Sequence, residues 1–146
     1  MAADGKDASG NIGVTAGGVD RVWGVGVDAV DVARFQAAAE RRPRLVTHLF
    51  DDEEVTYAGE GRNRWERLAA RFAAKEAIVK AAGGFRGSAW RQIVVGGRLN
   101  QPPPVAVGGP LGEWIEAHHL TVLVSLTHER AVAIAVAVLQ SAAEAP

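Results

Sequence analysis

The pattern of apolar and polar positions first becomes regular at a strand predicted from Val22 to Asp28. Alternation sets large apolar side chains on one face of this strand and sets Gly24, Gly26 and Asp28 on the other. Two glycines beside an aspartate leave room for another group to approach the backbone closely. Asp28 is therefore either a residue that caps the following helix, which is common, or part of a site beside the glycines.

A helical period then predicts one long helix, roughly from Asn63 to Ala82, that ends at the stop signal Gly83-Gly84. Its large apolar residues fall on one stripe, which we expect to face the core; they are Trp65, Leu68, Phe72 and Val79. Glu76 lies within this stripe, and Lys80 lies one turn further on at its edge. A carboxylate facing the core is costly unless a cation, a metal ion or several donors meet it. Glu76 and Lys80 therefore form either an ion pair at the border of the core or part of a site.

Shorter segments complete the pattern with small helices and antiparallel strands. Helices are predicted from Asp31 to Arg42, from the acidic cluster Asp51–Glu54 onward and from Leu111 to His118, and strands at Gln92–Val95, Pro104–Val107, Leu120–Thr127 and Ala131–Leu139. In the last strand, larger apolar residues alternate with alanines. We expect the larger residues to lie in the core and the alanine face to allow close approach of another element or subunit. Helices and antiparallel strands in separate runs indicate an α+β domain.

Length and composition narrow the class of protein. A chain of 146 residues is long enough for one domain with a real core, which we place at residues 21–140 between flexible tails at 1–20 and 141–146. A net charge of −1 provides no general attraction for nucleic acid. The absence of cysteine excludes disulfide and thiolate chemistry and suits a cytoplasmic protein. No apolar stretch is long enough to span a membrane, so we expect neither a nucleic-acid nor a membrane partner.

A few side chains could carry chemistry. Asp28 and Glu76 are hard oxygen ligands, and a Mg²⁺ site needs only one or two protein carboxylates besides water and substrate phosphates. Lys80 could hold a phosphate as a point charge. His128 is predicted at the tip of the final hairpin, where a lone histidine is usually solvated. Ser125 lies three positions earlier on a strand and points to the opposite face, which disfavours a serine–histidine dyad. Periodicity alone leaves open whether the two carboxylates meet in space.

Three blocks of sequence, in this order, carry a resemblance to a known family. They are Gly24-Val-Gly-Val-Asp-Ala-Val-Asp-Val-Ala-Arg-Phe35, Leu68-Ala-Ala-Arg-Phe-Ala-Ala-Lys-Glu-Ala-Ile-Val-Lys-Ala81 and Val124-Ser-Leu-Thr-His128. Over the region from about Trp23 to Leu139 the chain resembles the holo-acyl-carrier-protein synthase type of 4′-phosphopantetheinyl transferase. The resemblance implies a small α+β fold with an antiparallel sheet packed on a long helix. It also implies a trimer with active sites between subunits.

The resemblance implies a reaction as well. The family moves the phosphopantetheine arm of coenzyme A onto a serine of an apo acyl carrier protein and releases adenosine 3′,5′-bisphosphate. By this resemblance Asp28, Glu76 and Lys80 are the catalytic residues, and the two carboxylates would hold Mg²⁺ against the coenzyme A diphosphate. Lys80 and His128 would contact phosphates.

The resemblance extends to the surroundings of the site. Lys75 would assist at the phosphates, and Gly83 matches a glycine beside the coenzyme. Arg34, Phe35 and Arg41, in the basic first helix, would receive the acidic carrier protein. After Gly83 the chain reads Gly-Phe-Arg86, where the family commonly has Thr-Gly-Ile. This difference motivates an alternative, a non-catalytic module that binds coenzyme A or a carrier protein on the same fold.

Overall fold

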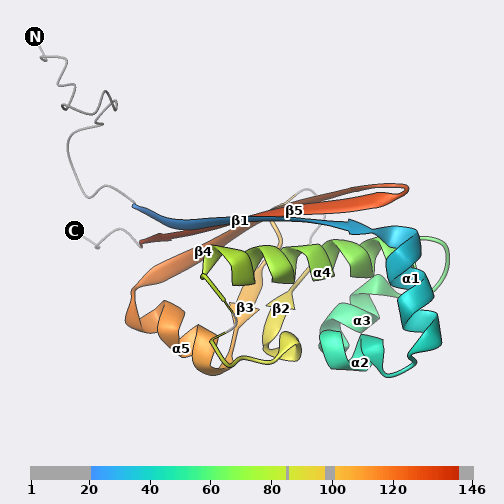
Figure 1. Cartoon of the computed structure of the whole chain (residues 1–146), viewed down its shortest axis with the longest axis horizontal. Helices are drawn as coiled ribbons and strands as arrows, with labels where there is room; N and C mark the ends of the chain where they lie inside the picture. The colour runs from blue at the N-terminus through green and yellow to red at the C-terminus, as the bar shows by residue number, and fades with distance from the viewer. Residues whose placement is uncertain (1–20, 85, 98–100, 142–146) are drawn as a thin grey trace, which may run out of the picture.

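The computed structural model describes residues 21–84, 86–97 and 101–141 (Figure 1). Most of the predicted tails, 1–20 and 142–146, lie outside these residues. The elements in chain order are β1 (Val22–Asp31), α1 (Val32–Arg41), α2 (Leu45–Leu49), α3 (Asp52–Ala58), α4 (Arg64–Ala81), a short 3-10 helix (Trp90–Gln92), β2 (Ile93–Val95), β3 (Val105–Val107), α5 (Gly109–Ala117), β4 (Leu120–Glu129) and β5 (Val132–Ser141).

The fold is a sheet with one long helix packed along it. The antiparallel strands β1, β5 and β4 form this sheet, with β5 in the middle, and β2 pairs with β3 in a second, two-stranded sheet. In Figure 1, α4 runs beneath the first sheet, with α1, α2 and α3 at one end and α5 at the other. The predicted α+β class and the sheet packed on a long helix are confirmed.

Small residues allow the sheet and the helix to come unusually close. The alanines of β5 (Ala133, Ala135 and Ala137) are buried on the side of α4. On β1, a Cβ atom added to Gly26 would collide with the backbone carbonyl of Ala77, and one added to Gly24 would collide with that of Ala81. The predicted close approach at the glycines and at the alanine face is therefore made by α4. Substitution at Gly26 would push β1 away from the helix.

The other face of the sheet contradicts the sequence-based expectation for the valine face. The large apolar residues of this face are exposed in the single chain; they are Val25, Val27, Leu123, Val132, Ile134 and Val136. Figure 1 shows all helices on the opposite side of the sheet. The expected burial of the valine face is wrong for one chain, because α4 takes the alanine face, where the backbones can approach. We call this exposed set the outer sheet face.

The apolar stripe of α4 also needs correction. Leu68 is buried, whereas Trp65, Phe72 and Val79 are only partly covered. The fully buried side of the helix is built mainly from alanines, with Ile78. The buried face of α4 is therefore rotated away from the predicted stripe, because alanines make the close contacts with the sheet. Glu76 lies at the border of the core, and is half-buried. Within the described residues, none of the helices is long and apolar enough to cross a membrane.

Candidate active site

Asp28 faces α4 from within β1. Its side chain points to the same side as Gly24 and Gly26 and is mostly covered, with 11% of its surface exposed. The following helix is capped by another residue, because Asp31 accepts a hydrogen bond from the backbone N–H of Arg34 at 2.8 Å. The interpretation of Asp28 as a helix cap is therefore wrong. The strand continues past Asp28 to Asp31, which leaves the carboxylate inside the sheet–helix interface.

Lys80 reaches back along α4 to this carboxylate. Its Nζ lies 2.7 Å from Oδ1 of Asp28 and donates a second hydrogen bond to the carbonyl of Val27 at 3.1 Å. The contact with Asp28 raises the pKa of Lys80, so the ammonium keeps its charge. More than half of the Lys80 side chain is exposed, so a ligand in solvent can reach it. The ion pair that the sequence suggested for Glu76 is thus made by Asp28.

Glu76 stands beside the same aspartate. Burial, together with a hydrogen bond and charge repulsion from Asp28, raises the pKa of Glu76 from 4.5 to about 7, and Lys80 opposes this shift. Two ionised carboxylates cannot donate hydrogen bonds to one another. The buried Oδ2 of Asp28 accepts no hydrogen bond from the described residues. When Glu76 takes up a proton, the two groups can share it. We call Asp28, Glu76 and Lys80 the carboxylate cluster.

These carboxylates fit a divalent cation. A bound cation can replace the shared proton, ionise Glu76 and give the buried Oδ2 atom of Asp28 a positive partner. The described residues contain no group of three or more His, Cys, Asp or Glu side chains arranged to hold a metal ion. Two oxygen ligands with open positions suit Mg²⁺, which keeps several waters or substrate oxygens. They do not suit a closed structural zinc site.

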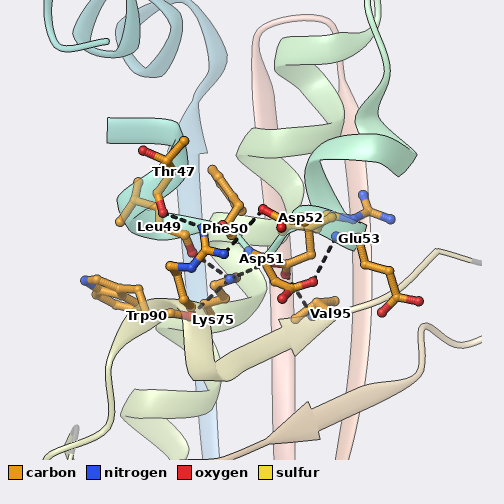
Figure 2. Close-up of polar contacts among 12 residues, drawn as sticks. Thr47, Leu49, Phe50, Asp51, Asp52, Glu53, Lys75, Trp90 and Val95 are labelled. Carbon is orange, nitrogen blue, oxygen red and sulfur yellow. Dashed lines mark hydrogen bonds and ion pairs between the residues drawn. The ribbon is translucent and has the colours of Figure 1, made fainter. Parts of the chain in front are cut away.

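Lys75 has a different environment from the one the resemblance implied. Its side chain is fully buried, and Nζ lies 2.7 Å from Oε2 of Glu54, which is also fully buried. The ammonium donates two further hydrogen bonds, to the carbonyls of Leu49 at 2.7 Å and Trp90 at 3.1 Å. All three of its N–H groups therefore have acceptors, and Figure 2 shows them converging between α2, α3, α4 and the 3-10 helix. The structure does not bring Lys75 to the carboxylate cluster.

Glu54 completes this buried network. Its Oε2 accepts from the backbone N–H of Asp51 at 2.9 Å, which closes a capping box at the start of α3. Its Oε1 accepts from the backbone N–H of Val95 at 2.9 Å. Burial lowers the pKa of Lys75, and the contact with Glu54 opposes that effect. The pair therefore joins β2 and the α2–α3 segment to α4.

His128 lies near the end of β4, the strand at the opposite edge of the sheet from β1, which carries Asp28. Its Nδ1 is 3.2 Å from Oε2 of Glu66, a residue in the first turn of α4. Glu66 and Glu76 are ten positions apart on one helix, which separates their backbones by about 15 Å. One chain therefore does not bring His128 together with the carboxylate cluster.

A cavity of about 340 Å³ opens beside His128. We call it the His128 pocket; its lining residues are Tyr57, Asn63, Arg67, Arg71, Gly96, Gly97, Gln101, Pro103, Leu126 and His128. The guanidinium of Arg71 stacks on Tyr57, 4.2 Å from the ring centroid, and donates to the carbonyls of Arg67 and Gly96. Two arginines and a histidine around one cavity favour an anion.

Comparison with known proteins identifies the family. The model of the 4′-phosphopantetheinyl transferase superfamily matches residues 24–137. The chain belongs to this superfamily. It is 43% identical over 124 residues to a holo-[acyl-carrier-protein] synthase of Beutenbergia cavernae, a match covering 82% of this chain and 98% of the relative. It is 40% identical over 120 residues to one from Clavibacter sepedonicus, with 82% and 96% covered.

Solved structures of holo-[acyl-carrier-protein] synthases have the same fold. The enzyme of Neisseria meningitidis matches with a TM-score of 0.73 and 28% identity, over 82% of this chain and 98% of that one. That of Mycobacterium tuberculosis matches with a TM-score of 0.65 and 34% identity, over 86% and 100%. One from Bacillus anthracis, solved in complex with CoA (3′,5′-ADP), has a TM-score of 0.67 and 25% identity, over 83% and 98%. The resemblance to the holo-acyl-carrier-protein synthase type is confirmed.

Within this transferase fold, the predicted carrier-binding residues divide into two kinds. Arg34 and Arg41 are exposed on α1. Phe35 is 6% exposed, and its ring packs against Phe50 and Phe72, with centroids 6.1 Å and 5.7 Å away. The apolar face of α1 turns Phe35 inward, so the structure does not present it to a partner. Gly83, at a φ of 74° just after α4, has no atom within 4 Å of a hypothetical Cβ, and thus stands open near Lys80.

Sequence reasoning missed several residues of the transferase's His128 pocket. Asn63, Arg67 and Arg71 recur at every fourth position, a spacing that places them on one face of a helix. This polar row was available in the sequence, within and just before the second of the three blocks, Leu68–Ala81. Glu66 had no comparable signal, because its contact with His128 joins a helix to a strand far away in the chain.

Proposed function

We propose that this protein transfers the 4′-phosphopantetheine arm of coenzyme A to a serine of an apo acyl carrier protein in a Mg²⁺-dependent reaction. The observation that supports this most is the carboxylate cluster. There, the exposed ammonium of Lys80 contacts Asp28, and one carboxylate oxygen of Asp28 has no hydrogen-bond partner in the described part of the chain. Glu76 beside it has a raised pKa. Family membership and the coenzyme A complex of a Bacillus anthracis relative agree with it.

In this reaction the serine oxygen forms a bond to the phosphorus next to the pantetheine arm. The phosphorus–oxygen bond to the other half of the diphosphate breaks, adenosine 3′,5′-bisphosphate leaves with the electron pair, and the serine proton is released. Asp28 and Glu76 would hold Mg²⁺, which supplies charge neutralisation for the diphosphate. Lys80 would bind a phosphate oxygen through its exposed ammonium. The chain thus acts mainly by positioning and by electrostatics.

A complete site requires more than one copy of the chain. His128 and Asp28 lie on strands at opposite edges of the sheet, so we propose that the His128 pocket of one copy meets the carboxylate cluster of the next. The outer sheet face supports association, because a contiguous exposed apolar surface on a small protein is typical of an interface. We propose the homotrimer implied by the resemblance. The exposed arginines of α1 would then attract the acidic carrier protein, in the cytoplasm, which the absence of cysteine suits.

Replacement of Ile134 by aspartate tests this assembly. Ile134 is 41% exposed in the middle of the outer sheet face, and a buried unpaired charge there would be strongly unfavourable in an oligomer. We expect Ile134→Asp to be a folded monomer with almost no transferase activity, as measured by analytical ultracentrifugation, circular dichroism and a transfer assay. Ala106→Asp, on the exposed side of β3, is the control and should remain oligomeric. A wild-type monomer with full activity would contradict the proposal.

Protonation of Glu76 should control metal binding. Because Mg²⁺ needs the ionised carboxylate and the pKa of Glu76 is about 7, Mg²⁺ affinity should rise about tenfold per pH unit below that value and level off above it. Without metal, the raised pKa stabilises the fold below pH 4.5, and this contribution is lost as the pH rises from 4.5 to about 7. Calorimetric titration and thermal unfolding between pH 4 and 8.5 would measure both; a Mg²⁺ affinity that does not vary with pH would contradict this assignment.

Intact-mass spectrometry tests the activity itself. An apo acyl carrier protein would be incubated with this protein, coenzyme A and Mg²⁺. We expect its mass to increase by one phosphopantetheine group, and we expect chelation of the metal to prevent the increase. Unmodified carrier proteins, together with measurable binding of coenzyme A or of a carrier, would instead favour the non-catalytic module.

A further inference from the structure

Glu66 has no role in the sequence motifs or in the proposed reaction. Its side chain is 25% exposed, and Oε2 lies 3.2 Å from Nδ1 of His128, whose side chain is 38% exposed. Glu66 comes from the first turn of α4 and His128 from the end of β4. The contact therefore ties the last residues of β4 to α4, at the edge of the His128 pocket.

This contact decides which nitrogen of His128 can serve a ligand. A carboxylate only accepts hydrogen bonds, so the 3.2 Å contact with Oε2 of Glu66 favours a proton on Nδ1. Among the described residues, Nε2 makes neither a hydrogen bond nor an ion pair. His128 lines the His128 pocket together with Arg67 and Arg71, and Nε2 is the ring atom left for a ligand there. In the imidazolium form Nε2 also carries a proton and donates to an anion.

We propose that Glu66 is a positioning residue, which holds the His128 ring so that its Nε2–H meets a phosphate of coenzyme A. This inference rests on the proposed function, because it takes coenzyme A as the ligand. Glu66 itself carries the wrong charge to bind a phosphate, so it acts through His128. A carboxylate that orients a functional histidine through its other ring nitrogen is the usual arrangement at sites where the ring must present one atom.

A double-mutant cycle on coenzyme A affinity tests whether Glu66 acts through His128. The four proteins are the wild type, Glu66→Ala, His128→Ala and the double variant, each titrated by calorimetry with coenzyme A and Mg²⁺. Loss of one hydrogen bond to a charged group should weaken binding about tenfold in His128→Ala, and Glu66→Ala should lose most of that factor. The double variant should bind no more weakly than His128→Ala. Additive losses would overturn the proposal.

Two further variants separate positioning from general structure. Glu66→Gln keeps an oxygen that accepts from Nδ1 and should recover affinity to within about threefold of the wild type. Glu116→Ala, an exposed glutamate on α5, should bind like the wild type. If Glu66→Gln binds as weakly as Glu66→Ala, or if Glu116→Ala binds equally weakly, orientation of His128 is not the cause and the proposal fails.

The ring nitrogens of His128 provide a readout that needs no ligand. In ¹⁵N spectra of the free protein near pH 8, we expect Nδ1 to carry the proton of the neutral ring in the wild type. We expect that preference to disappear in Glu66→Ala. If carrier protein is modified but the cycle is additive, this inference fails while the proposed function stands. If no carrier is modified, the proposed function fails, and the ¹⁵N spectra still show whether Glu66 holds the ring.

Discussion

Glu76→Gln should abolish phosphopantetheine transfer without loss of the fold. Removal of one of the two carboxylates that we propose as Mg²⁺ ligands is expected to lower kcat/KM by about a thousandfold or more, equivalent to about 4 kcal/mol. The folded state should be no less stable, because the neutral amide removes a half-buried charge that Asp28 repels. Transfer to carrier protein measured by mass spectrometry, together with thermal unfolding of the metal-free protein, would show both effects.

A second glutamate-to-glutamine variant serves as the matched control. Glu53→Gln alters an exposed residue on α3 and should leave activity and stability close to those of the wild type. If Glu76→Gln retained more than about a tenth of the wild-type activity, the loss of transition-state stabilisation would be at most about 1.4 kcal/mol. That result would contradict the proposed role of Glu76 as a metal ligand. A large fall in melting temperature would assign Glu76 a structural role instead.

Lys75→Met should mainly destabilise the protein. Loss of the ammonium leaves the fully buried carboxylate of Glu54 unpaired and leaves the carbonyls of Leu49 and Trp90 without this donor. Breaking a buried ion pair by removing one partner costs about 3–5 kcal/mol, a large share of the stability of a small domain. Denaturant unfolding would measure this loss. If Lys75→Met does not fold, Glu54→Gln, which removes the charge of the other partner, gives the same comparison with a smaller perturbation.

Lys80→Met is the matched control, since it removes a lysine from the same helix. Lys80 is largely exposed and pairs with Asp28 at the surface of the site. Its loss should reduce coenzyme A affinity and activity and should lower the unfolding midpoint less than Lys75→Met does, because Asp28 keeps some contact with solvent and can share the proton of Glu76. If Lys75→Met were as stable as the wild type but inactive, Lys75 would act by direct contact with coenzyme A and not by holding the buried network together.

The sequence alone indicated most of the local structure of this protein. Periodicity located β1, α4 and the final hairpin, because alternation and helical spacing follow directly from backbone geometry. The shared face of Gly24, Gly26 and Asp28 was also correctly predicted. Asp28 and Glu76 stood out because hard oxygen ligands at a core border need a cation. The ordered blocks around them were sufficient to name the family.

Tertiary structure decided which faces meet and which side chains reach the site. Alternation in β5 defines an alanine face and a valine face, but only the packing of α4 shows that alanine is inside. Lys75 and Glu76 are neighbours in the chain, yet a rotation of about 100° sends Lys75 into the core and leaves Glu76 at its border. His128 lies on the edge strand opposite the one that carries Asp28, and beside Glu66. Contacts between distant segments depend on how the elements pack, and local periodicity contains no information about that.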